Sequence, residues 1–337
     1  MGQAVDVDED WAMMGEAIAA AAMVRSRTSP NPWVGCVIVP AGDGPASVGA
    51  TQPPGGMHAE AAALALAGAD AAGAVAYVTL EPCSHHGRTP PCADALIDAG
   101  VRRVVVGIAD PDPHVQGTGI RRLQAAGVEV TLGVAADEIS EQLAPYLKHR
   151  TTGRPWVVLK LAASLDGRTA APDGSSRWIT GALARADAHR LRGESDAVLV
   201  GAGTVRADDP VLTVRDADGP SPLRVVLGHI PEGARILPAL ELGGDLGQVL
   251  DDLGARGVLQ LLVEGGATVA HDFHRAGLVD RYVLYLAPAL FGGDDGRPIF
   301  AGAGAASIDD VWRGRILSIE QLGDDVRIEL AGVGTAA

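Results

Sequence analysis

His58-Ala59-Glu60 opens the pattern that decides the fold of this chain, and Pro82-Cys83 and Pro91-Cys92 complete it. One imidazole and two thiolates are good ligands for tetrahedral Zn²⁺. Three protein ligands leave a fourth position for a water molecule that the metal ionises near neutral pH. The pattern therefore predicts a catalytic zinc site whose metal ligands are His58, Cys83 and Cys92.

A carboxylate stands two residues after the histidine, where Glu60 is not needed to hold the metal. Its position suits a general acid/base that moves protons between an attacking water and a leaving amine. A histidine, a glutamate and two later cysteines in this order are typical of zinc deaminases, which release ammonia from an amidine carbon. We therefore predict that Glu60 is catalytic.

Eight residues separate Cys83 from Cys92, whereas most zinc deaminases have two. Such a gap requires a loop that leaves the metal and returns to it. The loop carries His85, His86 and Arg88. A cation near the metal could bind an anionic group of the substrate, because guanidinium groups suit phosphate oxygens.

Simpler interpretations of these residues remain open. A lone His-x-Glu triplet is common on protein surfaces, and two cysteines can be buried apolar side chains. His85 or His86 could also supply a fourth ligand, which would make the zinc structural. Cys36 lies within the apolar run Val34–Val39, and we interpret it as a core residue of a buried strand.

Composition indicates an intracellular enzyme without a membrane span. The chain has 337 residues, of which 47% are hydrophobic and 20% charged, and this length allows two domains. Three cysteines, two of them assigned to metal, indicate a reducing compartment, so we expect a cytoplasmic location. No apolar run reaches about 18 residues. The net charge of −15 argues against nucleic-acid binding, although a few arginines can still bind one phosphate.

The first half of the chain alternates helix and strand patterns, and this predicts a three-layer α/β/α domain with the metal motifs at strand ends and helix starts. The expected helices are Asp10–Val24, His58–Ala67, a helix from Pro91, Gly117–Ala126 and Ala136–Arg150. The expected strands are Val34–Pro40, Ser47–Ala50, Val75–Leu80, Val101–Gly107 and Val128–Leu132.

Turn-forming residues at Thr151–Pro155 predict a domain boundary, with one domain at 1–150 and a second α/β domain at 151–337. The expected strands of the second domain are Trp156–Ala162, Ala197–Gly201, Leu223–Leu227, Leu259–Glu264 and, in an antiparallel tail, Arg281–Ala287, Ile316–Leu322 and Asp325–Leu330. The expected helices are Gly181–Leu191, Gly247–Ala255 and Ala267–Ala276. Glycine-rich turns at Val200–Thr204 and Val263–Thr268 could bring backbone N–H groups to a phosphate, but the dinucleotide fingerprint is absent.

Together these motifs resemble the bifunctional deaminase/reductase family of riboflavin biosynthesis. In the first half the resemblance lies in Asn31-Pro32-x-Val34-Gly35, His58-Ala59-Glu60 and the run from Thr79 to Cys92. In the second half it lies in Lys160–Gly167, Ser176–Thr180, Gly203–Arg215 and Glu264-Gly265-Gly266. The eight-residue gap between the cysteines is its most specific element.

The resemblance implies two consecutive reactions. A cytidine-deaminase-like domain would hydrolytically deaminate 2,5-diamino-6-(5-phosphoribosylamino)pyrimidin-4(3H)-one with one Zn²⁺. A dihydrofolate-reductase-like domain would then use NADPH to reduce the ribosyl group of 5-amino-6-(5-phosphoribosylamino)uracil to ribityl. The implied partner is this small phosphorylated substrate. Apart from the resemblance, the large apolar second domain favours a homodimer or larger homo-oligomer, and we expect no nucleic-acid partner and no membrane.

The resemblance also assigns roles to individual positions. NADPH would contact Lys160, Ala163, Trp178, Thr204, Asp208, Gly266, Ala267, Thr268, Val269 and Ala270. The substrates would contact Asn31, Arg88 and Asp110 in the deaminase and Ser176, Arg192, Leu212, Arg215 and Glu264 in the reductase.

Two departures from the family pattern affect these expectations. Asp112 stands where asparagine is usual in the deaminase. The stretch Pro238–Gly247 is expected to be too short for the strand and loop that normally precede the Glu264 turn, which would remove part of the cofactor-binding wall. A deaminase with a vestigial reductase domain, and a zinc-stabilised binding protein without turnover, are therefore alternative hypotheses.

Overall fold

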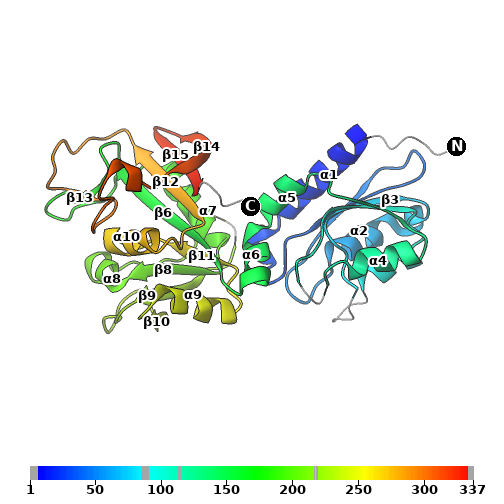
Figure 1. The fold of residues 1–337 in the computed structure, drawn as a ribbon, viewed down its shortest axis with the longest axis horizontal. Coiled ribbons are helices and arrows are strands. Elements are labelled where there is room, and N and C mark those ends of the chain that lie inside the picture. The colour runs from blue at the N-terminus through cyan, green and yellow to red at the C-terminus, as the bar shows by residue number, and fades with distance from the viewer. Residues whose placement is uncertain (1–6, 85–90, 113–114, 216, 218, 333–337) are drawn as a thin grey trace. The chain divides into compact units, whose positions relative to one another are not determined.

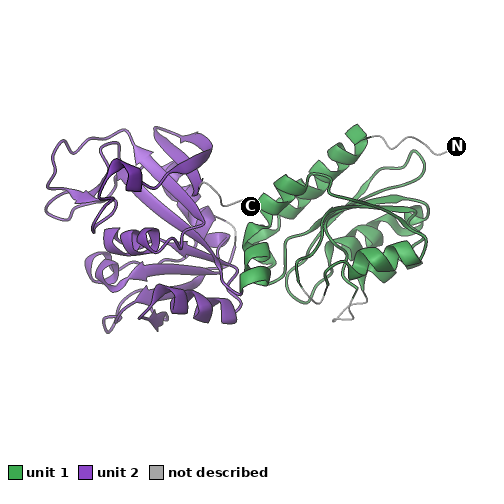
Figure 2. Ribbon diagram, viewed as in Figure 1, with its two compact units in different colours: residues 1–152, 337 green, residues 153–336 purple. Residues whose placement is uncertain are grey.

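The computed structural model describes residues 7–84, 91–112, 115–215, 217 and 219–332. It divides into two compact units, the first ending at Thr152 and the second beginning at Gly153 (Figure 2). Each unit is a layered α/β structure (Figure 1).

The first unit is built on a five-stranded sheet in the order β2-β1-β3-β4-β5. Strand β1 is antiparallel to β2 and β3, whereas β3, β4 and β5 are parallel. The strands are β1 (Gly35–Val39), β2 (Ser47–Ala50), β3 (Val75–Leu80), β4 (Arg103–Ile108) and β5 (Glu129–Leu132). The helices are α1 (Val7–Ala22), α2 (Ala59–Ala67), α3 (Cys92–Asp98), α4 (Thr118–Ala125), α5 (Ala136–Gln142) and α6 (Ala144–Thr152).

Helices cover both faces of this sheet. Helix α1 packs on β1 and β3 and α5 packs on β4, while α2 and α4 pack on the sheet with α3 between them (Figure 1). The central strand β3 is buried along its whole length, as expected for a parallel strand covered on both sides. The predicted α/β/α layering is confirmed.

The second unit contains an eight-stranded sheet in the order β10-β9-β8-β11-β6-β12-β15-β14. The first six strands in this order are parallel, and β15 and β14 extend the sheet with antiparallel pairs. Its strands are β6 (Trp156–Ser164), β8 (Ala197–Gly201), β9 (Leu223–Leu227), β10 (Leu240–Leu242), β11 (Gln260–Val263), β12 (Arg281–Ala287), β14 (Gly314–Leu322) and β15 (Asp325–Gly332). Strands β7 (Arg168–Ala170) and β13 (Arg297–Pro298) form a separate small pair.

The side chains of β6 alternate between two hydrophobic cores, as the period of a strand requires. Val157, Leu159 and Leu161 pack with α9 (Leu246–Ala255) and α10 (Ala267–Arg275) on one face. Val158 packs with α7 (Ala182–Gly193) and α8 (Ala202–Asp208) on the other face. Even-numbered residues of β6, Lys160 among them, therefore belong to the face that carries α7 and α8.

Two sequence-based expectations about these elements are wrong. The stretch 238–247 does contain a strand, because β10 pairs in parallel with β9 from Leu240 opposite Val225. Three residues are too few to show an alternating pattern in the sequence. The expected single helix at 136–150 is two helices, α5 and α6, which meet at Leu143. Pro145 lies in the first turn of α6, the place where a helix tolerates a residue without an N–H group.

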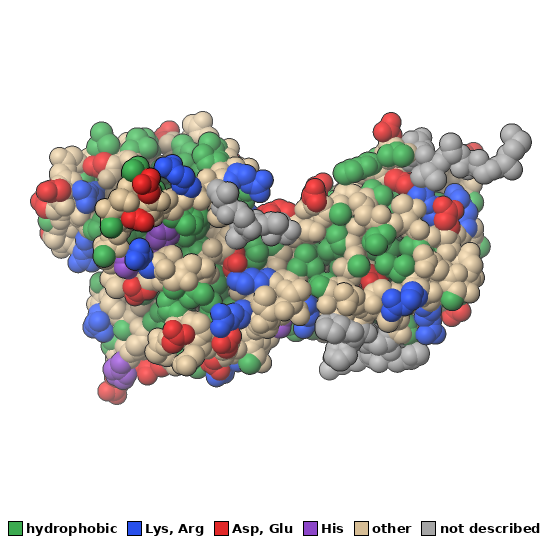
Figure 3. All heavy atoms as spheres, viewed as in Figure 1, with side chains coloured by type: hydrophobic (Ala, Val, Ile, Leu, Met, Phe, Trp, Pro, Cys, Tyr) green, Lys and Arg blue, Asp and Glu red, His purple; other side chains and the backbone are tan. Residues whose placement is uncertain are grey.

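On the face of the molecule in Figure 3, lysine and arginine side chains lie in small groups among acidic ones. This distribution agrees with the net charge of −15. Among the described residues, none of the helices combines the length and apolar composition needed to cross a lipid bilayer.

Candidate active sites

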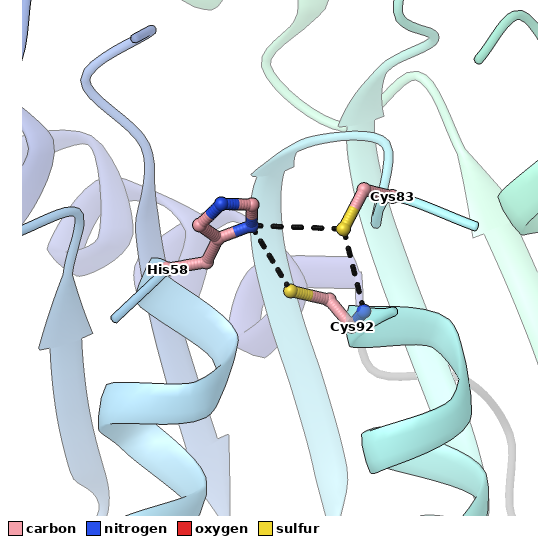
Figure 4. A group of neighbouring side chains, drawn as sticks. All are labelled: His58, Cys83 and Cys92. Carbon is pink, nitrogen blue, oxygen red and sulfur yellow. Dashed lines mark hydrogen bonds between the residues drawn. The ribbon is translucent and has the colours of Figure 1, made fainter. Parts of the chain in front are cut away.

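The three residues predicted to bind zinc come together at one end of the first sheet (Figure 4). His58 is the N-cap of α2, Cys83 follows the end of β3, and Cys92 is the first residue of α3. The His58 Nδ1 atom lies 3.6 Å from Cys83 Sγ and 3.3 Å from Cys92 Sγ. The backbone N–H of Cys92 also donates to Cys83 Sγ at 3.4 Å.

These distances fit a zinc ion. Zn–N distances of about 2.0–2.1 Å and Zn–S distances of about 2.3 Å in a tetrahedron place nitrogen and sulfur about 3.5 Å apart. All three ligand atoms lie within 4.8 Å of one another, and among the described residues no fourth ligand joins them, which leaves one tetrahedral position. The pKa of Cys83 is lowered, because its sulfur is hydrogen-bonded to the Cys92 thiol and to His58. A lowered thiol pKa favours the thiolate that a metal requires.

Glu60 lies in the first turn of α2, two residues beyond His58, and only 4% of its surface is exposed. Burial, followed by the nearby Cys83, raises the pKa of its carboxyl group to about 7. A group with a pKa near the operating pH both accepts and donates a proton efficiently. The environment of Glu60 therefore suits general acid/base chemistry beside the three metal ligands.

A cavity of about 210 Å³ opens beside the metal ligands. It is smaller than the range of about 300–1,000 Å³ typical of drug-sized ligands, so it suits a single ring. Asn31 and Asp110, both predicted from the resemblance, line it together with His58, Glu60 and Cys83. Burial raises the pKa of Asp110, whose carboxylate accepts a hydrogen bond of 3.0 Å from the Tyr146 hydroxyl.

The cavity also contains residues that the sequence analysis did not identify. Tyr146 and Arg150 reach it from α6, and the Arg150 guanidinium lies 5.1 Å from the centre of the Tyr146 ring. Asp112, the departure from the family pattern, has its Oδ2 atom 3.8 Å from Arg150 Nε. An arginine beside Asp112 offsets the negative charge that this departure adds to the cavity. Neither α6 residue belongs to a recognisable motif, so the sequence carried no signal for them.

The predicted substrate contact Arg88, with His85 and His86, lies outside the described residues.

In the second unit, two adjoining cavities of about 770 and 800 Å³ share Lys160, Ala162, Thr169, Ser176 and Asp208 in their linings. The first also contains Thr204, Glu264, Gly266, Ala267, Thr268 and Val269. The second also contains Trp178, Arg192, Leu212 and Arg215. The structure thus gathers residues from distant parts of the chain, predicted to bind cofactor or substrate, around one cleft.

Two predicted cofactor contacts do not line this cleft. Ala163 is 1% exposed, and the alternation along β6 places its side chain on the face opposite Lys160. Ala270 is fully buried in the core beneath α10. The side chains of both residues pack in the interior. These two positions therefore lie next to residues that line the cleft but do not line it themselves.

The two glycine-rich turns of the sequence meet in the cleft. Gly201 and Gly266 are the N-caps of α8 and α10, and the N–H of Gly266 donates to Thr204 Oγ1 at 3.1 Å. The N-terminal turn of α10 therefore opens into the cavity of about 770 Å³, where Gly266 to Val269 form part of the wall. Exposed N–H groups at a helix start suit phosphate oxygens such as those of a dinucleotide.

Three charged side chains form a cluster at the junction of the two cavities. Arg192 binds Glu264 through two nitrogens, with Nε–Oε1 and Nη2–Oε2 distances of 2.5 and 2.9 Å. Lys160 Nζ lies 3.9 Å from Glu264 Oε2. Burial raises the pKa of Glu264, but the neighbouring charges of Arg192, Lys160 and His189 together outweigh it, so the net pKa is lowered. Burial lowers the pKa of Lys160.

Comparison with protein families assigns the two halves of the chain separately. Residues 8–108 match the cytidine and deoxycytidylate deaminase zinc-binding region. Residues 155–328 match the RibD C-terminal domain.

Curated relatives match over almost the whole length. The riboflavin biosynthesis protein RibD of Mycobacterium tuberculosis is 44% identical, covering 97% of this chain and 98% of the relative. The protein of the same description from Escherichia coli is 40% identical, covering 96% of this chain and 100% of the relative.

Solved structures give the same result. Acinetobacter baumannii RibD is 39% identical with a TM-score of 0.91, covering 97% of this chain and 100% of that one. The Thermotoga maritima protein described as a diaminohydroxyphosphoribosylaminopyrimidine deaminase/5-amino-6-(5-phosphoribosylamino)uracil reductase is 32% identical with a TM-score of 0.87. The match covers 97% of this chain and 99% of that one.

Proposed function

Because this chain belongs to the RibD family of bifunctional riboflavin-biosynthesis enzymes, we propose that its two sites catalyse consecutive steps on one phosphorylated substrate. The protein is a zinc-dependent deaminase and an NADPH-dependent reductase. Residues 1–150 form the deaminase in this proposal, and residues 151–337 form the reductase.

The deaminase substrate is 2,5-diamino-6-(5-phosphoribosylamino)pyrimidin-4(3H)-one. The observation that carries this step is the buried Glu60 carboxylate beside His58, Cys83 and Cys92, in a cavity lined by Asn31 and Asp110. His58, Cys83 and Cys92 would hold a zinc ion, which would supply the Lewis acidity that makes water a nucleophile near neutral pH. Glu60 takes a proton from the attacking water at its carboxylate and passes it to the departing amino group, so that a C–O bond forms, the C–N bond breaks and ammonia leaves.

Asn31, Asp110 and Arg88 hold the pyrimidine and its attached groups. The Asn31 amide and the Asp110 carboxylate can form directional hydrogen bonds with the ring substituents. The Tyr146 hydroxyl fixes the rotamer of Asp110. These contacts place the amine-bearing carbon next to Glu60 and the metal ligands.

The reductase substrate is 5-amino-6-(5-phosphoribosylamino)uracil, the product of the first step. NADPH, when bound, would supply the hydride, and a proton would complete the reduction of the ribosyl group to ribityl. Thr204, Asp208 and the turn at 266–269 bind the cofactor with Lys160 and Trp178, whereas Ser176, Leu212, Arg215 and the Arg192–Glu264 pair bind the substrate. Strand β10 supports this proposal, because the stretch that was expected to be too short for a strand contains one.

One experiment tests both steps together. The diaminopyrimidine phosphate and NADPH are supplied to the zinc-loaded protein, and ammonia release and the loss of NADPH absorbance are followed in the same sample. We expect one ammonia for each NADPH oxidised. Ammonia without NADPH oxidation would instead indicate a deaminase with a vestigial second domain, and neither product would indicate a zinc-stabilised binding protein.

We also propose that the chain forms a homo-oligomer in the cytoplasm. Strand β14 is the edge of the second sheet, and Ile316 and Ile319 on it are 55% and 64% exposed. Long edge strands with exposed apolar side chains favour pairing with another chain. The net charge of −15 disfavours nucleic acid as a partner.

Replacing Ile316 and Ile319 with lysine tests the oligomer. The charges oppose burial of the strand, so we expect the particle mass measured by light scattering to fall to that of one chain. Leu66→Lys changes an equally exposed apolar residue of the first unit and should leave the mass unchanged. An unchanged mass in the double variant would exclude this edge as the interface.

A further inference from the structure

Glu81 is a buried carboxylate, 4% exposed, whose oxygens accept hydrogen bonds from four backbone N–H groups. Its Oε1 atom accepts from Gly119 at 2.9 Å and from Ile120 at 3.2 Å. Its Oε2 atom accepts from Gly117 at 2.9 Å and from Asp110 at 3.3 Å. All four donors belong to one segment, of which residues 110–112 and 115–120 are described, so one side chain binds the backbone at both ends of this segment.

The hydrogen bonds satisfy groups that the segment cannot satisfy itself. The first N–H groups of a helix have no partner within the helix, and the N-cap of α4, Gly117, offers no side chain to accept from them. Glu81 supplies the missing acceptors from a position 36 residues earlier in the chain. Its negative charge at the helix N-terminus is favourable as well.

The segment also touches the chain next to Glu81. A Cβ atom on Gly119 would lie 1.9 Å from the carbonyl oxygen of Pro82, so only glycine permits this approach. Ser84 Oγ and Thr118 Oγ1, at 2.5 Å, join the same two stretches. The start of α4 is therefore fixed against residues 81–84, which include the metal ligand Cys83.

The segment forms one wall of the deaminase cavity. Asp110, Asp112 and Val115 line the cavity, and the N–H of Asp112 donates to Asp110 Oδ1 at 2.9 Å. We infer that Glu81 is a positioning residue of the deaminase, which holds Asp110 and its wall at a fixed place relative to Cys83. This inference rests on the proposed role of Asp110 as a substrate contact.

Glu81→Gln tests the inference. The amide keeps one acceptor oxygen, but its NH₂ group would face N–H donors, so at least one pair of hydrogen bonds is lost. A wall displaced by about 1 Å is expected to lower kcat/KM for deamination on the order of 10²-fold. We expect the loss to appear mainly as a higher KM, with one zinc per chain retained and reductase activity on the deaminated substrate unchanged.

Asp10→Asn is the matched control. Asp10 is a buried carboxylate of the same unit, 3% exposed, which binds Arg103 at 2.7 Å and the Tyr77 hydroxyl at 3.1 Å and does not line the cavity. This variant should lower the thermal stability and leave the KM unchanged. If Glu81→Gln lowers stability in the same way with an unchanged kcat/KM, Glu81 is only structural and the inference is overturned.

A double variant separates this inference from the proposed function. If Glu81 acts through Asp110, adding Glu81→Gln to Asp110→Asn should raise the KM little further. If each single variant raises the KM strongly and the KM of the double variant rises by the product of the two effects, this inference is overturned while the proposed role of Asp110 stands. An unchanged KM in Asp110→Asn by itself would refute the proposed role of Asp110, and the inference with it.

Hydrogen exchange keeps the inference testable if Glu81→Gln fails to fold. In the unaltered protein, the amides of Gly117, Gly119 and Ile120 should exchange as slowly as those of β4, because each donates to a buried carboxylate. Exchange of these three amides at the rate of exposed loops would show that Glu81 does not hold the segment.

Discussion

Glu60→Gln is expected to reduce ammonia release on the order of 10²–10⁴-fold, the usual contribution of a general acid/base, while the protein keeps one zinc per chain. Glutamine has nearly the same shape as glutamate but cannot take up and return a proton. The metal ligands His58, Cys83 and Cys92 are unchanged, so zinc binding should persist. Ammonia release from the diaminopyrimidine phosphate and the zinc content of the same sample are the measurements.

His58→Ala is the control that separates proton transfer from metal binding. Removing the imidazole leaves two thiolates, and we expect loss of both zinc and ammonia release. The second unit provides an internal reference, because both variants should still oxidise NADPH when the deaminated substrate is supplied. Ammonia release within about twofold of the unaltered protein, with zinc present in Glu60→Gln, would contradict general acid/base catalysis by Glu60.

The sequence predicted those strands whose run of apolar residues matches their burial in the folded sheet. Strands β3, β8, β9 and β12 have the predicted bounds, because each is a short run rich in apolar residues in the interior of a sheet. The zinc ligands were also predictable, since metal coordination restricts both the residue types and their order. For the buried strands and the zinc ligands, the residue types and their order in the sequence were therefore enough for the prediction.

Other features depend on residues that meet only after folding. Glu81 belongs to a recognisable motif, but its four hydrogen bonds reach a segment 29 to 39 residues later, and no local pattern indicates them. Arg150 reaches the deaminase cavity from a helix without any motif. Family resemblance placed Ala163 and Ala270 near the cofactor, whereas strand alternation and core packing turn their side chains inward.

The pairing of Arg192 with Glu264 is a further case, since 72 residues separate them in the chain. We expect Arg192→Met to lower the free energy of unfolding of the second unit by about 3–5 kcal/mol at pH 7, the usual cost of removing one partner of a buried ion pair. Both side chains are largely buried, at 13% and 7% exposure. Methionine keeps much of the volume, so the loss reports the Glu264 carboxylate without its two-nitrogen partner, although Lys160 Nζ at 3.9 Å remains nearby. Denaturant unfolding followed by hydrogen exchange of peptides from the second unit gives this energy.

Arg190→Met is the matched control, because Arg190 lies on the same helix and pairs with Asp187 and Glu194, but its side chain is 44% exposed. An exposed pair contributes about 0–1 kcal/mol, so this variant should cost at most that amount. Asp187 also keeps Arg327 at 2.9 Å. Equal losses in the two variants would contradict a special role for the Arg192 pair.

The pH dependence supplies an independent check. In the unaltered protein Arg192 helps to hold the pKa of Glu264 below the ordinary value for glutamate. The ion pair therefore stabilises the fold fully at pH values above that ordinary pKa, and this stabilisation is lost as the pH falls through the lowered pKa. Without Arg192, we expect burial to outweigh the remaining charges and to raise the pKa of Glu264, so that ionisation destabilises the fold as the pH rises. The difference in unfolding free energy between the two proteins should therefore be largest near pH 7 and shrink toward pH 4. A difference that stays constant over this range would show that lost packing, rather than an unpaired Glu264 carboxylate, causes the destabilisation.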